Sequence, residues 1–129
     1  MKVINRYLTA DKDGIPGYLA HLDRKEAGPG LLIVHHRYGV TGNIKVKVCD
    51  FAKLGYTTVV PDLYKMLGIS NGIHEAQKKT TDGEFNEIIN SAWRYLTTRT
   101  EVDAKRCGVV GFCMGGRIGI HFVASNPGV

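Results

Sequence analysis

Residues 109–116 read Val-Val-Gly-Phe-Cys-Met-Gly-Gly, and the interpretation of the whole chain follows from this stretch. The apolar run Cys107–Val110 that leads into it is typical of a buried strand, and residues 117–120 continue with helical spacing. The sequence therefore predicts a strand, a sharp turn and a helix, with Cys113 at the turn.

The pattern Gly111-x-Cys113-x-Gly115 is the cysteine version of the nucleophile elbow. So tight a turn brings two backbones into close approach, which glycine tolerates two residues before and two residues after the nucleophile. The central residue is expected to adopt a strained conformation that lifts its sulfur above the sheet. Free N–H groups at the helix N-terminus favour a thiolate at Cys113 and an oxyanion beside it.

Other interpretations of Cys113 carry less weight. A structural cysteine on a glycine-rich turn is one alternative, because free cysteine is often a small core residue. A dinucleotide-binding turn requires Gly-x-Gly-x-x-Gly, which no register of residues 108–119 supplies. A redox-sensing thiol is a third alternative, and no Cys-x-x-Cys partner accompanies it.

Length and composition indicate one ordinary globular domain. A chain of 129 residues can bury a core of its own. The net charge of +5 is modest and no basic patch is interleaved with aromatic residues, which argues against nucleic acid as a partner. No apolar run suits a membrane span, and no signal-peptide pattern is present. An odd number of cysteines, Cys49, Cys107 and Cys113, predicts free thiols in a reducing cytoplasm, without disulfides or a zinc site.

Periodicity and turn signals divide the chain into alternating strands and helices. The expected strands are residues 2–9, 17–22, 31–34, 56–60 and 107–110, with turns or loops at 11–14, 24–30 and 103–106. The expected helices are residues 43–54, 81–96 and 114–125, with a short one at 74–79. Thr81 and Glu84 have the spacing of a capping box. This alternation predicts the α/β class: a mostly parallel sheet with helices on both faces and an antiparallel hairpin at one edge.

Taken in order, these motifs resemble the dienelactone hydrolase family, a branch of the α/β-hydrolase fold. The markers are His35–Gly39 after an apolar strand, Gly55-Tyr56, Pro61–Tyr64 and Gly111–Gly116. The resemblance extends over nearly the whole chain.

The resemblance implies a hydrolase of small lactones or esters that works through an acyl-enzyme, with no metal or organic cofactor. Cys113 would be the nucleophile. The backbone N–H groups of Met114 and Arg37 would form the oxyanion hole.

Family members often carry a glutamate at the position of His36, and two roles for this histidine are open. Its imidazole can pair with a Cys113 thiolate, or it can cap the preceding strand. Tyr38 and Tyr64 are candidates to line the pocket, with ordinary packing as the alternative. The cations available for a substrate carboxylate are Arg37 and the Lys78-Lys79 pair.

No Asp or Glu follows Cys113, and the one later histidine, His121, lies eight residues further along the same helix. That spacing is about 12 Å along the axis, which excludes His121 as the base. The resemblance therefore predicts that residues 1–129 form one incomplete domain, the N-terminal half of a hydrolase, without the triad's acid and histidine. We expect self-association through the sheet edge left open or through the apolar surface around the helix that follows Cys113. The alternative function is a non-catalytic binding or assembly module that retains the first half of the fold.

Overall fold

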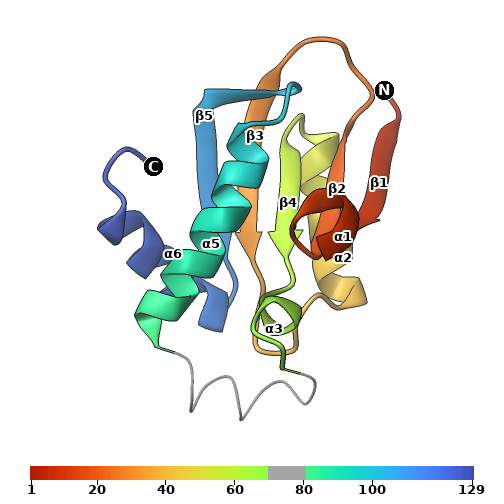
Figure 1. Ribbon diagram of the computed structural model, residues 1–129. Coiled ribbons are helices and arrows are strands. Elements are labelled where there is room, and N and C mark those ends of the chain that lie inside the picture. The colour runs from red at the N-terminus through yellow and green to blue at the C-terminus, as the bar shows by residue number, and fades with distance from the viewer. Residues whose placement is uncertain (70–80) are drawn as a thin grey trace.

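The computed structural model describes residues 1–69 and 81–129. These residues contain a five-stranded mixed sheet in the order β1-β2-β4-β3-β5 (Figure 1). The strands are β1 (Val3–Leu8), β2 (Gly17–Leu22), β3 (Gly28–Val34), β4 (Thr57–Pro61) and β5 (Val102–Gly111). β2 pairs antiparallel with β1 and β4, whereas β3 pairs parallel with β4 and β5. The predicted α/β class and the antiparallel hairpin at one edge are confirmed.

Helices cover both faces of this sheet. α2 (Gly42–Lys53) lies behind it in the view of Figure 1, while α5 (Asp82–Thr97) and α6 (Met114–Ser125) lie in front. Two short helices, α1 (Ala10–Asp13) and α3 (Leu63–Met66), follow β1 and β4. The hydrophobic core is accordingly split into one cluster under α5 and α6 and another under α2.

The apolar run Leu31–Val34 forms the buried centre of the sheet. Leu32 and Val34 pack in the cluster under α5 and α6, whereas Ile33 packs in the cluster under α2. A strand covered on both faces needs apolar side chains on both, which is why this run is continuous and not alternating.

Helix α2 begins and ends close to the expected positions. The Thr41 hydroxyl caps it by accepting the Ile44 N–H at 3.4 Å, and Gly55 follows its end with φ of 105°. Its buried residues are Ile44, Val48 and Ala52, and Phe51 is partly buried beside them.

Helix α5 confirms the capping box at Thr81 and Glu84. Its buried residues are Phe85, Ile89, Ala92 and Leu96, and Ile88 is only partly buried. The ring of Trp93 lies with its centroid 6.0 Å from that of Phe122 on α6, so Trp93 serves in helix packing.

Three boundaries differ from the sequence prediction. β3 begins at Gly28, inside the expected loop, because the Gly28 N–H donates to the Glu101 carbonyl at 3.0 Å. Residues 103–106 belong to β5 and not to a separate turn, although the pairing with β3 is irregular there. Residues 10–13 form a helical turn, capped by Thr9 and ended by Gly14 with φ of 82°. The helix expected at 74–79 and the Lys78-Lys79 pair lie outside the described residues.

The parallel strands direct their carboxyl ends toward one end of the molecule, the lower end in Figure 1. α3 and the start of α6 lie at this same end, while the two chain termini lie toward opposite edges of the sheet. Open α/β sheets bind ligands at the carboxyl ends of their strands, so this end is where a site is expected.

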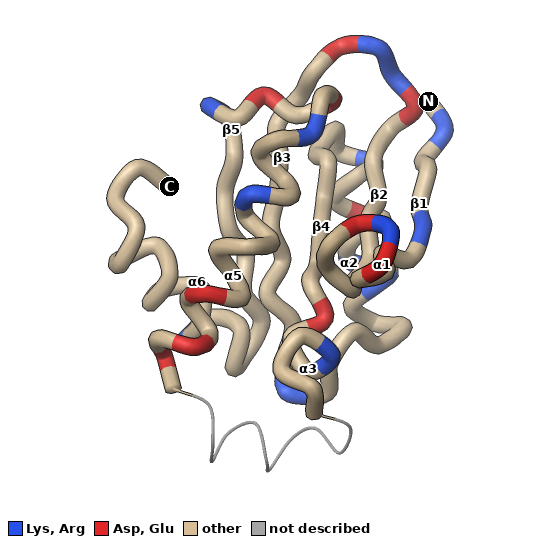
Figure 2. Tube along the Cα trace, in the orientation of Figure 1, with Lys and Arg blue, Asp and Glu red and all other residues tan. Residues whose placement is uncertain are grey.

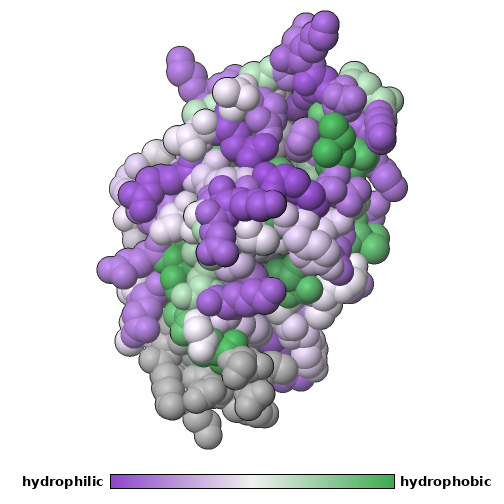
Figure 3. All heavy atoms as spheres, turned by 45° about the vertical axis from the view of Figure 1, so that its right-hand side comes forward, coloured by the Kyte–Doolittle hydropathy of each residue, from purple (hydrophilic) through white to green (hydrophobic). Residues whose placement is uncertain are grey.

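The surface is mixed in charge and mostly hydrophilic on the side of the N-terminal hairpin. Figure 2 shows Lys and Arg interspersed with Asp and Glu along the chain. On the face shown in Figure 3, hydrophobic residues form small separate patches. Within residues 1–69 and 81–129, no helix has the length and hydrophobicity needed to cross a membrane.

Candidate active site

Cys113 sits at the turn between β5 and α6 in a strained backbone conformation. Its φ is 54° and its ψ is −114°, and among the described residues no other non-glycine has a positive φ. L-residues with a side chain rarely adopt this region, so the surrounding contacts must hold it. The cysteine is exposed at the carboxyl end of β5. The strain predicted at the elbow is confirmed.

The two glycines that flank the elbow are required by backbone contacts. A Cβ at Gly111 would lie 2.1 Å from the Gly115 carbonyl oxygen, and a Cβ at Gly115 would lie 2.1 Å from the Val34 carbonyl oxygen. Both distances are far below van der Waals contact, so neither position admits a side chain without moving backbone. The structure therefore supports the physical reason given for the Gly-x-Cys-x-Gly pattern.

A cavity of about 560 Å³ opens beside the thiol. It is lined by Arg37, Cys113, Met114 and Arg117. The Met114 N–H is the first of helix α6, and helix geometry leaves such a group without an intrahelical acceptor. Within the described residues the Arg37 N–H has no acceptor either. The structure thus brings together, around one cavity, the cysteine and both residues predicted to supply oxyanion donors.

His36 forms part of a tight turn after β3. Its carbonyl accepts the Gly39 N–H at 3.1 Å, and its ring Nδ1 accepts the Tyr38 N–H at 3.2 Å. Among the described contacts none joins His36 to Cys113 by a hydrogen bond. This arrangement supports the capping alternative for His36.

Tyr38 is 59% exposed and contacts the side chain of its neighbour. Its hydroxyl accepts a hydrogen bond from Arg37 Nη2 at 2.7 Å, and the Arg37 guanidinium lies 4.9 Å from the centre of its ring. Tyr38 therefore orients the Arg37 guanidinium and is absent from the side chains that line the described cavity.

His35 is fully buried directly below this turn. Its Nδ1 lies 2.6 Å from the His36 carbonyl oxygen, which can only accept, so Nδ1 carries the proton. Its Nε2 lies 3.1 Å from the Leu63 backbone nitrogen, which can only donate, so Nε2 is unprotonated. Burial lowers the pKa of His35, which agrees with the neutral ring that these contacts require.

Tyr64 reaches the same turn from α3. Its hydroxyl donates to the Arg37 carbonyl and lies 3.9 Å from the Met114 sulfur. Burial raises the pKa of Tyr64, so the hydroxyl keeps its proton and acts as a donor. Tyr64 thus contacts residues on both sides of the cavity.

Arg117 is a cavity residue that the sequence analysis missed. It follows Cys113 by one helical turn, and this i, i+4 spacing could have indicated it. Its guanidinium pairs with Asp82 at 3.0 Å, and both side chains are largely exposed. His121, further along α6, lies with Nδ1 3.3 Å from Asn86 Oδ1, so it faces α5 and not the thiol.

The other two cysteines, Cys49 and Cys107, do not line the cavity beside Cys113. All three cysteines are unpaired, and burial raises the pKa of Cys49 and Cys107. No group of three or more His, Cys, Asp or Glu that could hold a metal occurs within residues 1–69 and 81–129.

A sequence model described as the dienelactone hydrolase family matches residues 15–129. A "Putative carboxymethylenebutenolidase" of Methylorubrum extorquens is 32% identical in an alignment 126 positions long, which covers 92% of this chain and 43% of that protein. "Protein usf" of Aquifex pyrophilus is 30% identical in an alignment 129 positions long, which covers 91% of this chain and 54% of its own.

The fold has close counterparts among solved structures. A "Putative Dienelactone Hydrolase" from Klebsiella pneumoniae superposes with a TM-score of 0.84 at 25% identity, over 99% of this chain and 57% of the other. The chain therefore spans about half the length of the relatives that it matches.

Proposed function

The chain belongs to the dienelactone hydrolase family, and from that premise we propose that it carries the nucleophilic half of a hydrolase of small lactones or esters. Residues 1–129 would form one incomplete α/β-hydrolase domain. The observation that carries the proposal is the strained Cys113 at the start of α6, beside a cavity that also contains Arg37 and Met114.

In the proposed reaction the Cys113 thiolate attacks the substrate carbonyl carbon. The carbonyl oxygen becomes an oxyanion, which accepts hydrogen bonds from the backbone N–H groups of Arg37 and Met114. The C–O bond then breaks, the leaving oxygen takes a proton from solvent and departs as an alcohol, and the acyl group remains on sulfur as a thioester. Attack by water on this thioester releases the acid and restores the thiol.

Water needs a general base for the second step. Within the described residues, His36 caps its turn, His35 is buried in two hydrogen bonds and His121 faces α5. His21 is on β2 with its Nδ1 2.9 Å from the Leu22 carbonyl oxygen, at the end of that strand away from the carboxyl end of β4. We therefore place the acid and histidine of the triad outside the described residues.

We also propose that the substrate carries an anionic group. Two arginine residues, Arg37 and Arg117, line the cavity that contains the thiol. Arginine binds carboxylates with paired N–H donors, and the Arg37 side chain is already oriented by Tyr38. The name of the Methylorubrum relative, a carboxymethylenebutenolidase, refers to a carboxylate-bearing lactone and supports this choice.

The experiment follows p-nitrophenol release and intact mass after mixing the protein with p-nitrophenyl acetate. We expect an acetyl group on Cys113 and release that Cys113→Ala abolishes. Cys107→Ala is the matched control, because its half-buried thiol lies outside the cavity and its loss should change nothing. Mono-p-nitrophenyl suberate, which has a free carboxylate too distant to attack its own ester, should acylate Cys113 faster than p-nitrophenyl octanoate, which has an uncharged chain of the same length. An equal rate for Cys113→Ala and wild type would refute the proposal.

A second candidate is a non-catalytic assembly module, and the outer edge of β5 favours it. Among the described strands β5 pairs only with β3, so its other edge has unpaired backbone groups. An apolar groove of about 470 Å³ runs along this edge between β5 and α6. Two copies can pair their β5 strands antiparallel about a two-fold axis, each covering the other's groove. Self-association without Cys113-dependent acylation would favour this candidate over the hydrolase.

A reducing compartment is part of the same proposal. A nucleophilic Cys113 must remain a free thiol, and the structure contains no disulfide among its three cysteines.

A further inference from the structure

We propose that His35 and Tyr64 are positioning residues that fix the direction of the Arg37 backbone N–H. The proposal rests on the oxyanion role proposed above for that N–H. Neither side chain lines the cavity beside Cys113, so both would act through the Arg37 backbone and not on the substrate.

The first step of the argument concerns the peptide group that joins His36 and Arg37. In a planar trans peptide the C=O and the N–H point in opposite directions. The His36 carbonyl accepts two hydrogen bonds, from His35 Nδ1 at 2.6 Å and from the Gly39 N–H at 3.1 Å. Holding this oxygen therefore also sets the direction of the Arg37 N–H.

The next peptide group is held as well. The Tyr64 hydroxyl donates to the Arg37 carbonyl, and Tyr64 itself is only 8% exposed. Arg37 thus lies between two restrained peptide groups, although its side chain is in solvent. An exposed turn that would otherwise be mobile has its backbone tied to the protein interior.

His35 is itself held in one orientation. Its Nε2 accepts the Leu63 N–H at the start of α3, and its ring centre lies 5.2 Å from that of Tyr64 at an interplanar angle of 60°. A ring turned over by 180° would lose both hydrogen bonds. α3, which contributes no side chain to the cavity, therefore determines where the oxyanion donor points.

This role can be separated from a general structural role by comparing two reactions of the same thiol. Acyl transfer from p-nitrophenyl acetate passes through a tetrahedral oxyanion, so it depends on the Arg37 N–H. Alkylation by iodoacetamide is a displacement at carbon with iodide leaving, and it forms no carbonyl oxyanion. The ratio of the acylation rate to the alkylation rate at Cys113 therefore reports the oxyanion donors and cancels changes in the thiol itself.

We expect this ratio to exceed that of glutathione in the wild type and to fall about tenfold in Tyr64→Phe and in His35→Ala. His35→Asn keeps an N–H near the position of Nδ1 and should recover most of the ratio. Tyr95→Phe, which removes a half-buried hydroxyl from a residue that does not line the cavity, is the matched control and should keep the wild-type ratio. Alkylation rates should be unchanged throughout.

Two other outcomes would contradict the positioning role of His35 and Tyr64, and they can be told apart. Because Tyr64→Phe removes only one oxygen, it carries the test even if His35→Ala fails to fold. A wild-type ratio retained by folded Tyr64→Phe and His35 variants would overturn the positioning role alone. A wild-type ratio no higher than that of glutathione would overturn the oxyanion hole, and the positioning role with it.

Discussion

Gly115 shows how a single hydrogen atom in place of a side chain determines the geometry at the thiol. A Cβ at Gly115 would lie 2.1 Å from the Val34 oxygen and 2.6 Å from the His35 oxygen, both of them backbone atoms. Gly115→Ala must therefore push α6 away from β3. We expect a loss of about 3 kcal/mol in the free energy of unfolding, measured by urea denaturation.

Gly116, the next residue, provides the control for the Gly115→Ala substitution. A Cβ at Gly116 would lie 3.6 Å from its nearest neighbour, the Gly111 oxygen, which is ordinary contact. Alanine has a higher helix propensity than glycine. Gly116→Ala should therefore leave the free energy of unfolding unchanged or raise it by up to about 1 kcal/mol. Equal effects of the two substitutions would contradict the close-approach explanation.

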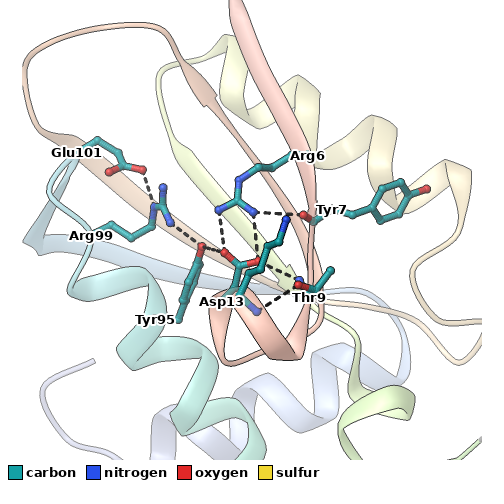
Figure 4. A network of polar contacts seen from close by, with 8 residues as sticks. Arg6, Tyr7, Thr9, Asp13, Tyr95, Arg99 and Glu101 are labelled. Carbon is teal, nitrogen blue, oxygen red and sulfur yellow. Dashed lines mark hydrogen bonds and ion pairs between the residues drawn. The ribbon is translucent and has the colours of Figure 1, made fainter.

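At the scale of elements, a polar network joins the N-terminal hairpin to α5 (Figure 4). Arg6 on β1 pairs with Asp13 on α1 at 2.8 Å, and the Tyr95 hydroxyl on α5 lies 3.5 Å from the same carboxylate. Arg99 donates to that hydroxyl at 2.6 Å. The Asp13 side chain is 9% exposed, so its hydrogen bonds are shielded from solvent. These contacts attach β1 and α1 to the body of the molecule.

The network predicts how stability depends on pH. The hydrogen bond from Arg6 is the main cause that lowers the pKa of Asp13 from 3.8 to about 2. A carboxylate with a depressed pKa in the folded state stabilises it fully above pH 3.8, and this contribution is lost as the pH falls through about 2. As the pH falls between these values, the free energy of unfolding of wild type should fall by about 1 kcal/mol more than that of Asp13→Asn, allowing for solvent screening.

Thermal unfolding followed by circular dichroism at several pH values measures this difference. Asp11→Asn is the matched control, because Asp11 is an exposed carboxylate on the same short helix. Its acid dependence should resemble that of wild type. If the stability of Asp13→Asn depends on pH as that of wild type does, Asp13 does not contribute to the acid dependence of stability.

For the whole molecule, the two edges of the sheet differ in a way that predicts how copies interact. β1 is short and has the charged Arg6, whereas β5, which among the described strands pairs only with β3, has its other edge beside the groove under α6. Ile120 and Val123, which line this groove, are 74% and 38% exposed. We expect the chain to dimerise through this edge, because pairing of two β5 strands would cover the exposed apolar side chains of the groove.

Sedimentation velocity over a wide range of protein concentration measures the association. Ile120→Lys should shift the protein to monomer, because it places a charge in the groove. Val46→Lys on α2 changes a residue of similar exposure away from the groove and should not affect association. A wild-type protein that sediments only as a monomer would refute the assembly.

Much of the fold and part of the candidate site could be predicted from local pattern. Three features are each explained by residues that are close together in the sequence. They are the strand run Leu31–Val34, the capping box at Thr81 and the Gly111-x-Cys113-x-Gly115 elbow. Hydrophobic periodicity, cap chemistry and the steric demand of a tight turn act over that distance. The sequence by itself therefore determined the α/β class and the position of the strained cysteine.

Only the tertiary structure decided which side chains support that cysteine. His35, Tyr64 and Arg117 had weak or no local signals, and Tyr64 reaches the turn at Arg37 from a separate element. The start of β3 at Gly28 depends on a hydrogen bond to Glu101, far away in the chain. Such contacts join residues that are distant in sequence, so no local pattern encodes them. They exist because packing of the strands and α3 brings a particular carbonyl within reach of a particular donor.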